Sequence, residues 1–361
     1  MSFLLAFVTQ KINLTFARYC LILELYPDLM IAALDNFRLC QNQKWLEKWS
    51  VTTKDGLGQK LAELEIKLRE LNIELLAFCD DNYPVEFKSL SDYPLVLYYQ
   101  GQITLLQNQA KITIVGSRNI HQYTKQVLEV CLNPIVDRLT TVSGLALGVD
   151  AAVHNSSTMN SGKTIAIIGS GLDDKSFYPS FNLNLKAKIL ESGGLIISEY
   201  ASGTKPTPFS FPRRNRLLAA LSSTTWVVQA SQKSGSLITA RVALELGHNV
   251  ATTPASIVDN NFAGNISLMR DGANLICDSA DLLGLLNLSQ NFLQNKIVSE
   301  QITFTSDAQK LIYENLSAEP INLDKLQEIT GINLQLLNSN LTLLEIGGLV
   351  SSIGNNDWIK E

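Results

Sequence analysis

KITIVGSR, residues 111–118, is a short apolar run that ends in a glycine, a serine and a cation. Such a run predicts a strand that is buried on both faces of a parallel sheet. Five more runs of this type follow, and most pairs are separated by roughly 20–30 residues, which is room for a crossover helix. The six predicted strands are 111–115, 140–142, 164–168, 195–197, 225–228 and 249–252.

Helical patterns fill the intervals between these runs, at 122–138, 150–160, 182–191, 214–221 and 236–246. Strands that alternate with helices in this way predict a Rossmann-like, doubly wound α/β domain with a mostly parallel sheet. The segment before the first run contains Tyr-Pro pairs and one further strand-like run at 95–99. We therefore predict that this domain spans 76–290.

The two flanking regions have a helical character. Residues 1–75 predict a small helical domain, because leucines recur there on one helical stripe. A polar segment, 287–305, separates a C-terminal piece that reads as three helices (307–316, 323–330 and 333–344) followed by a small hairpin. Three helices and a hairpin are typical of a winged helix, which we place at 306–361. The leucines of the first stripe are Leu57, Leu61, Leu64, Leu68 and Leu71.

Composition excludes several classes of protein. The chain has 361 residues, of which 46% are hydrophobic and 17% charged, as expected of two or three globular domains. No apolar run approaches the roughly 20 residues of a membrane span, and the N-terminus lacks a basic leader. The five cysteines are scattered without a C-x-x-C pair, which argues against a zinc ribbon or a disulfide framework. We expect a soluble cytoplasmic protein with no metal, no cofactor and no membrane contact.

Charge is unevenly distributed along the chain. The net charge is −5, yet residues 111–290 carry 15 Lys and Arg against 12 Asp and Glu, a balance of +3. The remaining residues carry 14 against 22, a balance of −8. This contrast favours an anionic ligand at the middle domain, while the acidic flanks repel non-specific nucleic acid.

Four loops that follow predicted strands combine glycine with serine, and two of them add a cation. Parallel strands present such loops at one edge, where backbone N–H groups, hydroxyls and helix N-termini can bind phosphate. Any single loop of this kind is also explained by the need of βα turns for Gly and Ser. Together, however, the four loops predict a phosphate site. Its residues are Gly116, Ser117, Arg118, Ser143, Gly144, Gly169, Ser170, Gly171, Lys233, Ser234, Gly235 and Ser236.

The densest cluster of cations opens the helix predicted near 214. Three arginines lie within Arg213-Arg214-Asn215-Arg216, and guanidinium groups suit phosphate geometry. We assign Arg213, Arg214 and Asn215 to phosphate binding and expect neighbouring phenylalanines to stack on bases. Arg216 is expected instead to brace Glu199 or another acid structurally.

Evidence for catalysis is thin. Asp150 and His154 are spaced i,i+4 and could form an acid–base pair, but Asp150 is better explained as a residue that caps its helix or orients a loop. Gly169-x-Gly171 lacks the third glycine of a dinucleotide fingerprint, and Ser161-Gly162-Lys163-Thr164 precedes a strand where a P-loop would follow one. We therefore predict no catalytic residues and no enzyme activity.

The ordered motifs of the middle domain resemble those of the DNA processing protein A family, known as DprA or Smf. FPRRNR at 211–216 and SGSLITA at 234–240 are the most specific of them, and the resemblance extends over roughly 80–361. The other matching runs are IVGSR at 114–118, SGLALGVDAAVH at 143–154, GKTIAIIGSGLDDKSFYPSFN at 162–182, GGLIISEYASGTKP at 193–206 and RDGA at 270–273.

The resemblance implies a protein that binds single-stranded DNA independently of base sequence. It implies protection of incoming DNA during natural transformation (competence), help in loading the RecA recombinase, and a homodimer formed through the Rossmann-like domain. Four positions depart from the family pattern: Leu147 (usually Arg), Gln229 (usually Glu), Ala255 (usually Gly) and Ile266 (usually Asn). The loss of an arginine at 147 removes one possible phosphate contact.

Two other classes of function stay open. A nucleotide-binding enzyme or sensor, similar to phosphoribohydrolases, would use the same scaffold, but the PGGxGT-x-x-E loop of those enzymes is replaced here by Lys233-Ser-Gly-Ser-Leu-Ile-Thr-Ala. A regulator that reads DNA through its winged helix would need cations on its third helix. Residues 333–344 contain no Arg or Lys, which argues against that class.

Overall fold

The computed structural model describes residues 57–78, 80–288, 304, 306–317, 320–346, 349–354 and 357–360 of the 361-residue chain. Two compact units divide between Gln290 and Asn291. Most of the predicted N-terminal helical domain, residues 1–56, lies outside the described residues. Its last helix, α5 (Leu57–Glu70), is present, and Leu68 is buried in a core cluster of the first unit.

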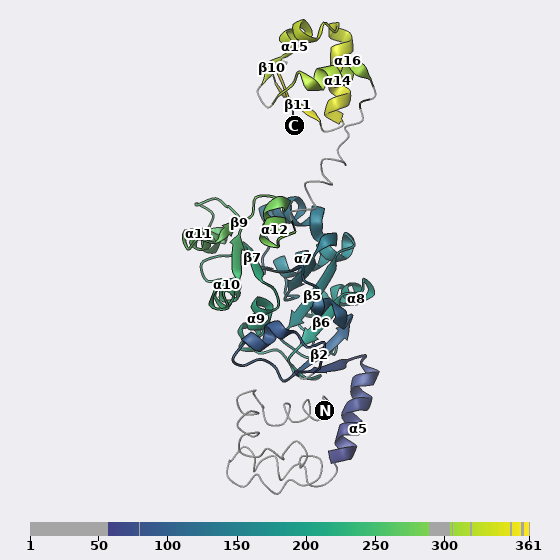
Figure 1. Ribbon diagram of the computed structural model, residues 1–361, viewed down its shortest axis with the longest axis vertical. Coiled ribbons are helices and arrows are strands. Elements are labelled where there is room, and N and C mark those ends of the chain that lie inside the picture. The colour runs from purple at the N-terminus through teal and green to yellow at the C-terminus, as the bar shows by residue number, and fades with distance from the viewer. Residues whose placement is uncertain are drawn as a thin grey trace. The chain divides into compact units, whose positions relative to one another are not determined.

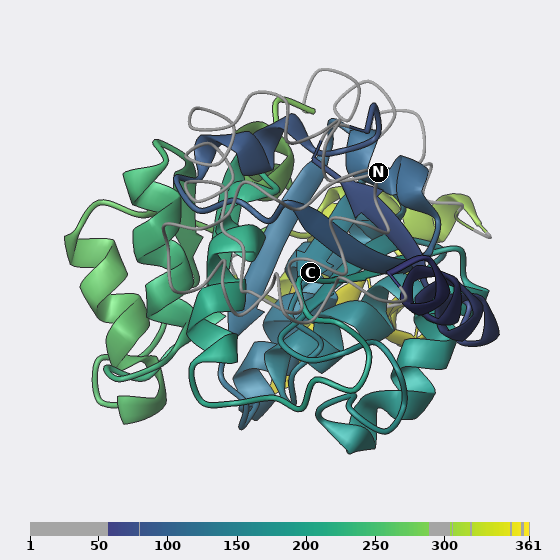
Figure 2. The same ribbon diagram turned by 90° about the horizontal axis from the view of Figure 1, so that it is seen from below.

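A nine-stranded sheet forms the centre of the first unit (Figures 1 and 2). The strand order is β1-β2-β6-β5-β4-β3-β7-β8-β9, and all neighbours are parallel except β1 with β2 and β2 with β6. The Rossmann-like, mostly parallel sheet that the sequence predicts is thereby confirmed. The strands are β1 (Glu74–Ala77), β2 (Val96–Gly101), β3 (Lys111–Gly116), β4 (Thr140–Ser143), β5 (Lys163–Ile168), β6 (Leu195–Ser198), β7 (Thr224–Gln229), β8 (Asn249–Thr252) and β9 (Asn274–Leu275).

Helices cover both faces of this sheet, and β5 shows why the strands read as continuous apolar runs. Ile165 and Ile167 belong to one core cluster, while Ala166 and Ile168, which point the other way, belong to a second. The first cluster includes residues of α9 and α10, and the second includes residues of α5 and α8. The helices that follow α5 in this unit are α6 (Gln122–Val127), α7 (Val149–Met159), α8 (Leu183–Glu191), α9 (Ser210–Ala220), α10 (Ser236–Glu245), α11 (Ala263–Arg270) and α12 (Ser279–Leu285).

The direction of winding reverses at β3. From β3 the chain adds β4, β5 and β6 on one side, and then returns to add β7, β8 and β9 on the other. The switch point therefore lies between β3 and β7, where loops that run to opposite sides of the sheet leave room for a ligand.

Several elements differ from the sequence prediction. The helix predicted at 122–138 is broken: α6 passes into a π-helical turn (Leu128–Leu132) and a 3-10 segment (Asn133–Arg138), because Pro134 cannot continue an α-helix. The helix predicted from 214 begins at Ser210. β1 and β9 were not predicted, since both are short and β9 has no buried residue.

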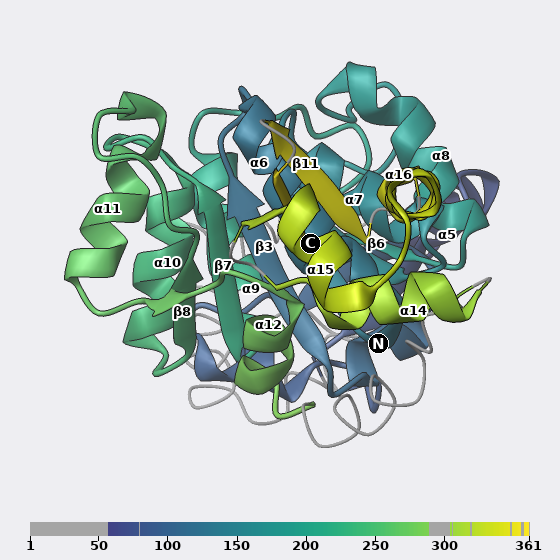
Figure 3. The same cartoon turned by 90° about the horizontal axis from the view of Figure 1, so that it is seen from above.

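The described residues of the second unit form three helices and a three-stranded sheet, which confirms the winged-helix prediction (Figure 3). A leucine-rich cluster that includes Leu326, Leu341 and Trp358 forms its core. The additional strand, β10, pairs with β12 and was not predicted. The elements are α14 (Asp307–Glu314), β10 (Ile321–Asn322), α15 (Leu323–Thr330), α16 (Leu334–Ile346), β11 (Val350–Gly354) and β12 (Asp357–Lys360). Within the described part of the chain, none of the helices has the length and apolarity to cross a membrane.

Candidate functional site

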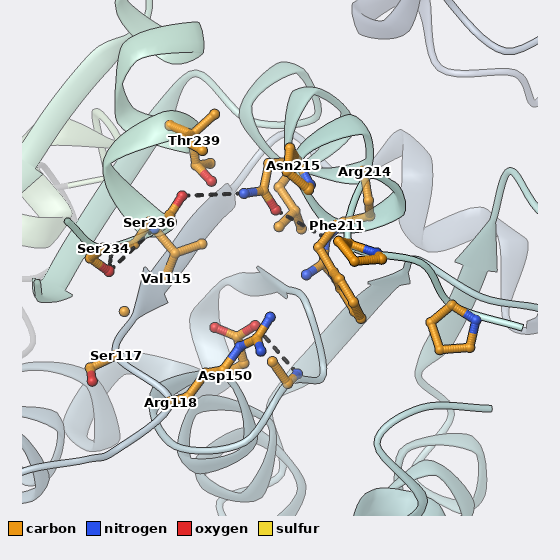
Figure 4. A pocket seen from close by; sticks show the side chains of 18 of the residues that line it. Val115, Ser117, Arg118, Asp150, Phe211, Arg214, Asn215, Ser234, Ser236 and Thr239 are labelled. Carbon is orange, nitrogen blue, oxygen red and sulfur yellow. Dashed lines mark hydrogen bonds between the residues drawn. The ribbon is translucent and has the colours of Figure 1, made fainter.

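A pocket of about 760 Å³ opens at the switch point between β3 and β7. The loops after β3 and β7 form one side of it, and α9 with the segment that precedes it forms the other (Figure 4). The lining residues that bear charged, aromatic, hydroxyl or amide groups, or that are glycines in the loops, include Gly116, Ser117, Arg118, Asp150, Tyr178, Phe211, Arg214, Asn215, Ser234, Gly235, Ser236 and Thr239.

Arg118 is the exposed cation of the pocket. Its guanidinium lies 5.2 Å from the centroid of the Phe211 ring, a cation–π contact that leaves its N–H donors available. Gly148, the N-cap of α7, has a φ of 79° and packs so closely under this loop that a Cβ would lie 2.2 Å from the Ser117 carbonyl oxygen. Glycine is required there both for its conformation and for its lack of a side chain.

Gln229, at the end of β7, holds the loop that carries Arg118. Its side-chain oxygen accepts hydrogen bonds from the His121 N–H (2.9 Å) and the Thr124 hydroxyl (2.8 Å), and its amide donates to the Asn119 carbonyl (3.1 Å). An ionised glutamate, which the family resemblance leads us to expect, has no donor for the Asn119 carbonyl. The departure at 229 therefore adds a hydrogen bond to the site.

The N-terminus of α10 supplies the second group of donors. The Ser234 and Ser236 hydroxyls lie 2.7 Å apart beside Gly235, where a helix N-terminus favours negative charge. One turn further on, Thr239 is 1% exposed, and its hydroxyl has no hydrogen-bond partner within the described residues. Lys233, predicted to join this group, is exposed in the same loop but is not among the residues that line the pocket.

Arg214 forms the buried wall of the pocket. It donates to the Gly144 carbonyl (2.6 Å), to the Ile167 carbonyl and to the side-chain oxygen of Asn215 (3.2 Å). A Cβ at position 144 would lie 2.5 Å from the guanidinium, so only glycine leaves room for it. Burial lowers the pKa of Arg214, while the nearby Asp150 carboxylate raises it.

Asp150 lies in the first turn of α7 and accepts a hydrogen bond from the Ala146 N–H (3.4 Å), so it orients the β4–α7 loop. Burial raises the pKa of Asp150, and the Arg214 charge opposes that shift. His154 is buried below it, with Nδ1 2.7 Å from the Thr164 hydroxyl. Burial and the Arg214 charge lower the pKa of His154 to about 3, so its ring is neutral at pH 7.

The other two arginines of the cluster contact Glu199. Arg216 is paired with Glu199 (2.9 Å) and with Asp92 (3.0 Å), and all of its side chain but 10% is buried. Arg213 also contacts Glu199 (3.0 Å), with 39% of its side chain exposed. The Arg216–Glu199 pair is thus present, and Arg213, predicted to bind phosphate, lies on the same side of α9 rather than in the pocket.

The predicted residues that follow β4 and β5 do not themselves line the main pocket, although Ala146 of the β4–α7 loop does. Ser143 is fully buried and donates to the Ile114 carbonyl (2.7 Å), and Ser170 is 1% exposed. The Gly171 N–H donates to the Thr204 carbonyl, which covers that loop. Gly144 and Gly169 line a separate recess of about 30 Å³ beside Arg118 and Leu147. The predicted residues that the pocket brings together therefore come from the loops after β3 and β7, with Arg214 and Asn215 of α9.

Two of the lining residues named above, Thr239 and Tyr178, were not predicted from the sequence. Thr239 lies three positions after Ser236, and this helical spacing on one face was the available signal. The Tyr178 ring lies 5.7 Å from the Phe211 ring, but nothing in the sequence connects these two residues. Within the described residues, no group of three or more His, Cys, Asp or Glu side chains could hold a metal ion.

Comparison with known proteins gives a consistent result. The model of the DNA recombination-mediator protein A family matches residues 74–287, and that of the DprA winged helix domain matches 301–356. The DNA processing protein DprA of Streptococcus pneumoniae is 40% identical over 56% of this chain and 71% of its own length. The protein Smf of Synechocystis is 31% identical over 90% of this chain and 93% of its own.

Two solved structures are similar to the first unit. The X-ray structure of DprA from Streptococcus pneumoniae has a TM-score of 0.56 and 35% identity, and covers 63% of this chain and 80% of that one. The second structure describes the single-stranded DNA binding mode of DNA processing protein A from Helicobacter pylori. It has a TM-score of 0.53 and 30% identity. It covers 62% of this chain and 97% of that one.

Proposed function

The chain belongs to the DNA recombination-mediator protein A family, and on that premise we propose that it binds single-stranded DNA without reading base sequence. The single observation that carries the proposal is the pocket at the switch point. There, an exposed guanidinium, an aromatic ring and a helix N-terminus lie at one edge of the sheet. All three groups recognise what every nucleotide shares, a phosphate and the face of a base.

Two strongly exposed phenylalanines support a path for the strand beyond the pocket. Phe209, which precedes α9, is 85% exposed, and Phe181 is 88% exposed. Such rings stack on bases of any kind, and each stacked base contributes about 1–3 kcal/mol. The strand then crosses the pocket with phosphates near Arg118, Ser234 and Ser236.

In this proposal the protein acts by binding and not by catalysis. Asp150 and His154, the pair most similar to an acid and a base, are buried, and each contacts another group: the Ala146 N–H and the Thr164 hydroxyl. The biological role is to protect incoming strands in natural transformation and recombination and to help load the RecA recombinase onto them. The protein carries out this role in the cytoplasm.

We also propose that the protein is a homodimer formed through the Rossmann-like unit. Ile257 and Val258, in the segment after β8, are 86% and 85% exposed, and Leu275 of the edge strand β9 is 48% exposed. Exposed apolar residues, and a strand that is the last of its sheet within the described residues, suit a protein interface. Light scattering of the wild type and of Ile257→Asp tests this: a dimer that the charged variant converts to a monomer is expected, and a wild-type monomer contradicts it.

The DNA proposal is tested by fluorescence anisotropy with a labelled single strand and the matching duplex, over a series of salt concentrations. We expect tighter binding of the single strand, and a similar affinity for strands of different sequence. Arg118→Ala should weaken binding by about tenfold or more, since a hydrogen bond to a charged group contributes about 1.5–3 kcal/mol. It should also reduce the slope of log affinity against log salt by about 0.7.

Arg241→Ala is the matched control, because Arg241 is exposed on α10 and is not among the residues that line the pocket. Its affinity should stay close to that of the wild type. Tighter binding of duplex than of single strand would overturn the proposed function. Wild-type affinity and slope in a folded Arg118→Ala protein would instead show that DNA binds elsewhere.

A further inference from the structure

We propose that the pocket also binds a free ribonucleoside 5′-phosphate as a whole molecule, so that nucleotide and DNA strand compete for it. The inference rests on the proposed function only in that both ligands use the same pocket. Three features of the pocket support it: its size, the separation of its phosphate-binding end from its aromatic end, and the carboxylate between them.

The size of the pocket matches a small molecule. Its volume of about 760 Å³ is within the roughly 300–1,000 Å³ range of small-molecule sites. Its walls come from the loops after β3, β4 and β7, from α9 and α10, and from the segment around Tyr178. A surface that only follows a DNA backbone needs no such hollow at the switch point of the sheet.

One end of the pocket is suited to a phosphate group. Ser234, Gly235 and Ser236 surround the N-terminus of α10, a ten-residue helix whose dipole favours an anion. Thr239, one turn along, lines the same end, and its buried hydroxyl lacks a hydrogen-bond partner within the described residues. A buried hydroxyl without a partner is costly, and a ligand oxygen would satisfy it.

The other end is suited to a base. The Phe211 ring has the Arg118 guanidinium 5.2 Å from its centroid and the Tyr178 ring at 5.7 Å. Figure 4 shows Phe211 on the side of the pocket opposite to Ser117 and Ser234. A molecule that spans the pocket can therefore stack its base on this end while its phosphate meets the serines.

Asp150 distinguishes a free nucleotide from an internal nucleotide of DNA. Its carboxylate lies between the two ends (Figure 4) and, when ionised, can only accept hydrogen bonds. An internal deoxyribose has its 3′ and 5′ oxygens esterified and has no 2′-hydroxyl, so its sugar cannot donate a hydrogen bond. A free ribonucleotide carries two sugar hydroxyls, and an acidic residue that binds ribose hydroxyls recurs in Rossmann-type nucleotide sites. The geometry therefore favours the ribonucleotide at this position.

The experiment is displacement of a labelled single strand from the full-length protein at constant ionic strength. The competitors are AMP, 2′,3′-dideoxy-AMP and inorganic phosphate. We expect AMP to displace the strand at millimolar concentration or below, and dideoxy-AMP to need about ten times more, because it has no sugar hydroxyl to donate to the Asp150 side chain. Equal midpoints for AMP and dideoxy-AMP, or no displacement by AMP at about 10 mM, would overturn the inference.

Two variants locate the effect. Asp150→Asn keeps an oxygen for the Ala146 N–H and should remove the preference for AMP over dideoxy-AMP, whereas a preference that survives counts against the inference. Thr239→Val has nearly the same shape and should weaken both nucleotides equally. Since the comparison of the two competitors uses wild-type protein, it does not depend on the folding of a variant.

Calorimetric titration of AMP without DNA separates this inference from the proposed function. If DNA binds and AMP does not, the inference fails and the proposed function stands. If AMP binds and single-stranded DNA does not, the proposed function fails instead. Chromatography of the recovered AMP should show it intact, because the proposal is one of binding and not of turnover.

Discussion

The two sides of α9 use the same residue type in opposite ways. On one side, Arg213 and Arg216 contact a carboxylate, Glu199. On the other, Arg214 donates to backbone carbonyls at the wall of the pocket, beside Arg118, whose N–H donors are still available. A local density of cations therefore does not identify a ligand contact. What matters is which of these cations are already paired with acceptors within the fold.

The largest effect on stability is expected from Arg216, whose guanidinium is paired with carboxylates of the fold. Arg216→Ala leaves Glu199 with fewer partners in a mostly buried position, and breaking a buried pair costs about 3–5 kcal/mol. We expect the free energy of unfolding, measured in urea, to fall by about that amount. Arg270→Ala, an exposed control on α11, should change it by less than about 0.5 kcal/mol. Equal losses for the two variants would remove the contrast between the sides of α9.

Acid titration tests the buried side of the pocket. The pKa of His154 is lowered from 6.5 to about 3, so between these values the unfolded chain binds a proton that the native protein does not. Stability should therefore fall as pH drops through this window, by at most about 1.4 kcal/mol for each pH unit. His154→Gln should flatten this part of the curve of unfolding free energy against pH. Asp150 acts with the opposite sign, because its raised pKa favours the native state as pH falls.

A smaller effect is expected from Arg213, which the sequence assigned to phosphate binding. Its guanidinium is already paired with Glu199, and an exposed or half-exposed ion pair contributes only about 0–1 kcal/mol of interaction free energy. Arg213→Ala should therefore weaken single-strand binding by about threefold, clearly less than Arg118→Ala. Anisotropy titrations of the two variants in parallel measure the difference. A larger loss from Arg213→Ala would show that the strand passes on the Glu199 side of α9.

The smallest effect is expected from the second unit. Its third helix, α16, carries no Lys or Arg, and a helix without cations releases few counterions from DNA. Removing residues 300–361 should leave single-strand affinity within about threefold of the full-length value. A hundredfold loss would instead make this unit a principal DNA-binding surface.

The sequence predicted the sheet well because burial on both faces leaves a strong signal. The runs at 111–115 and 164–168 are continuous and apolar, and each corresponds to a strand. β9 could not be found in this way, because both of its residues are exposed. The helix predicted at 122–138 was too long because its periodicity continues past Pro134, although the backbone geometry does not.

The site was harder to predict than the fold. Gly169 and Ser143 look like Gly116 and Ser117 in sequence, since all four follow buried strands. Only the topology separates them, because the pocket forms where winding reverses between β3 and β7, and that reversal depends on long-range pairing. The ion pair of Arg216 could be predicted from the sequence, since a guanidinium in a mostly buried helix needs a partner.

The bond from Gln229 to the Asn119 carbonyl joins residues 110 positions apart, and the one from Gln229 to the His121 N–H joins residues 108 apart. A chain still being synthesised lacks one wall of the pocket until Ser236 has left the ribosome. Until then the loop that presents Arg118 also lacks the side chain that holds it. Nascent chains on a ribosome, surrounded by RNA and nucleotides, thus carry no assembled binding site, and the ability to bind is acquired late, when the second half of the sheet closes against the first.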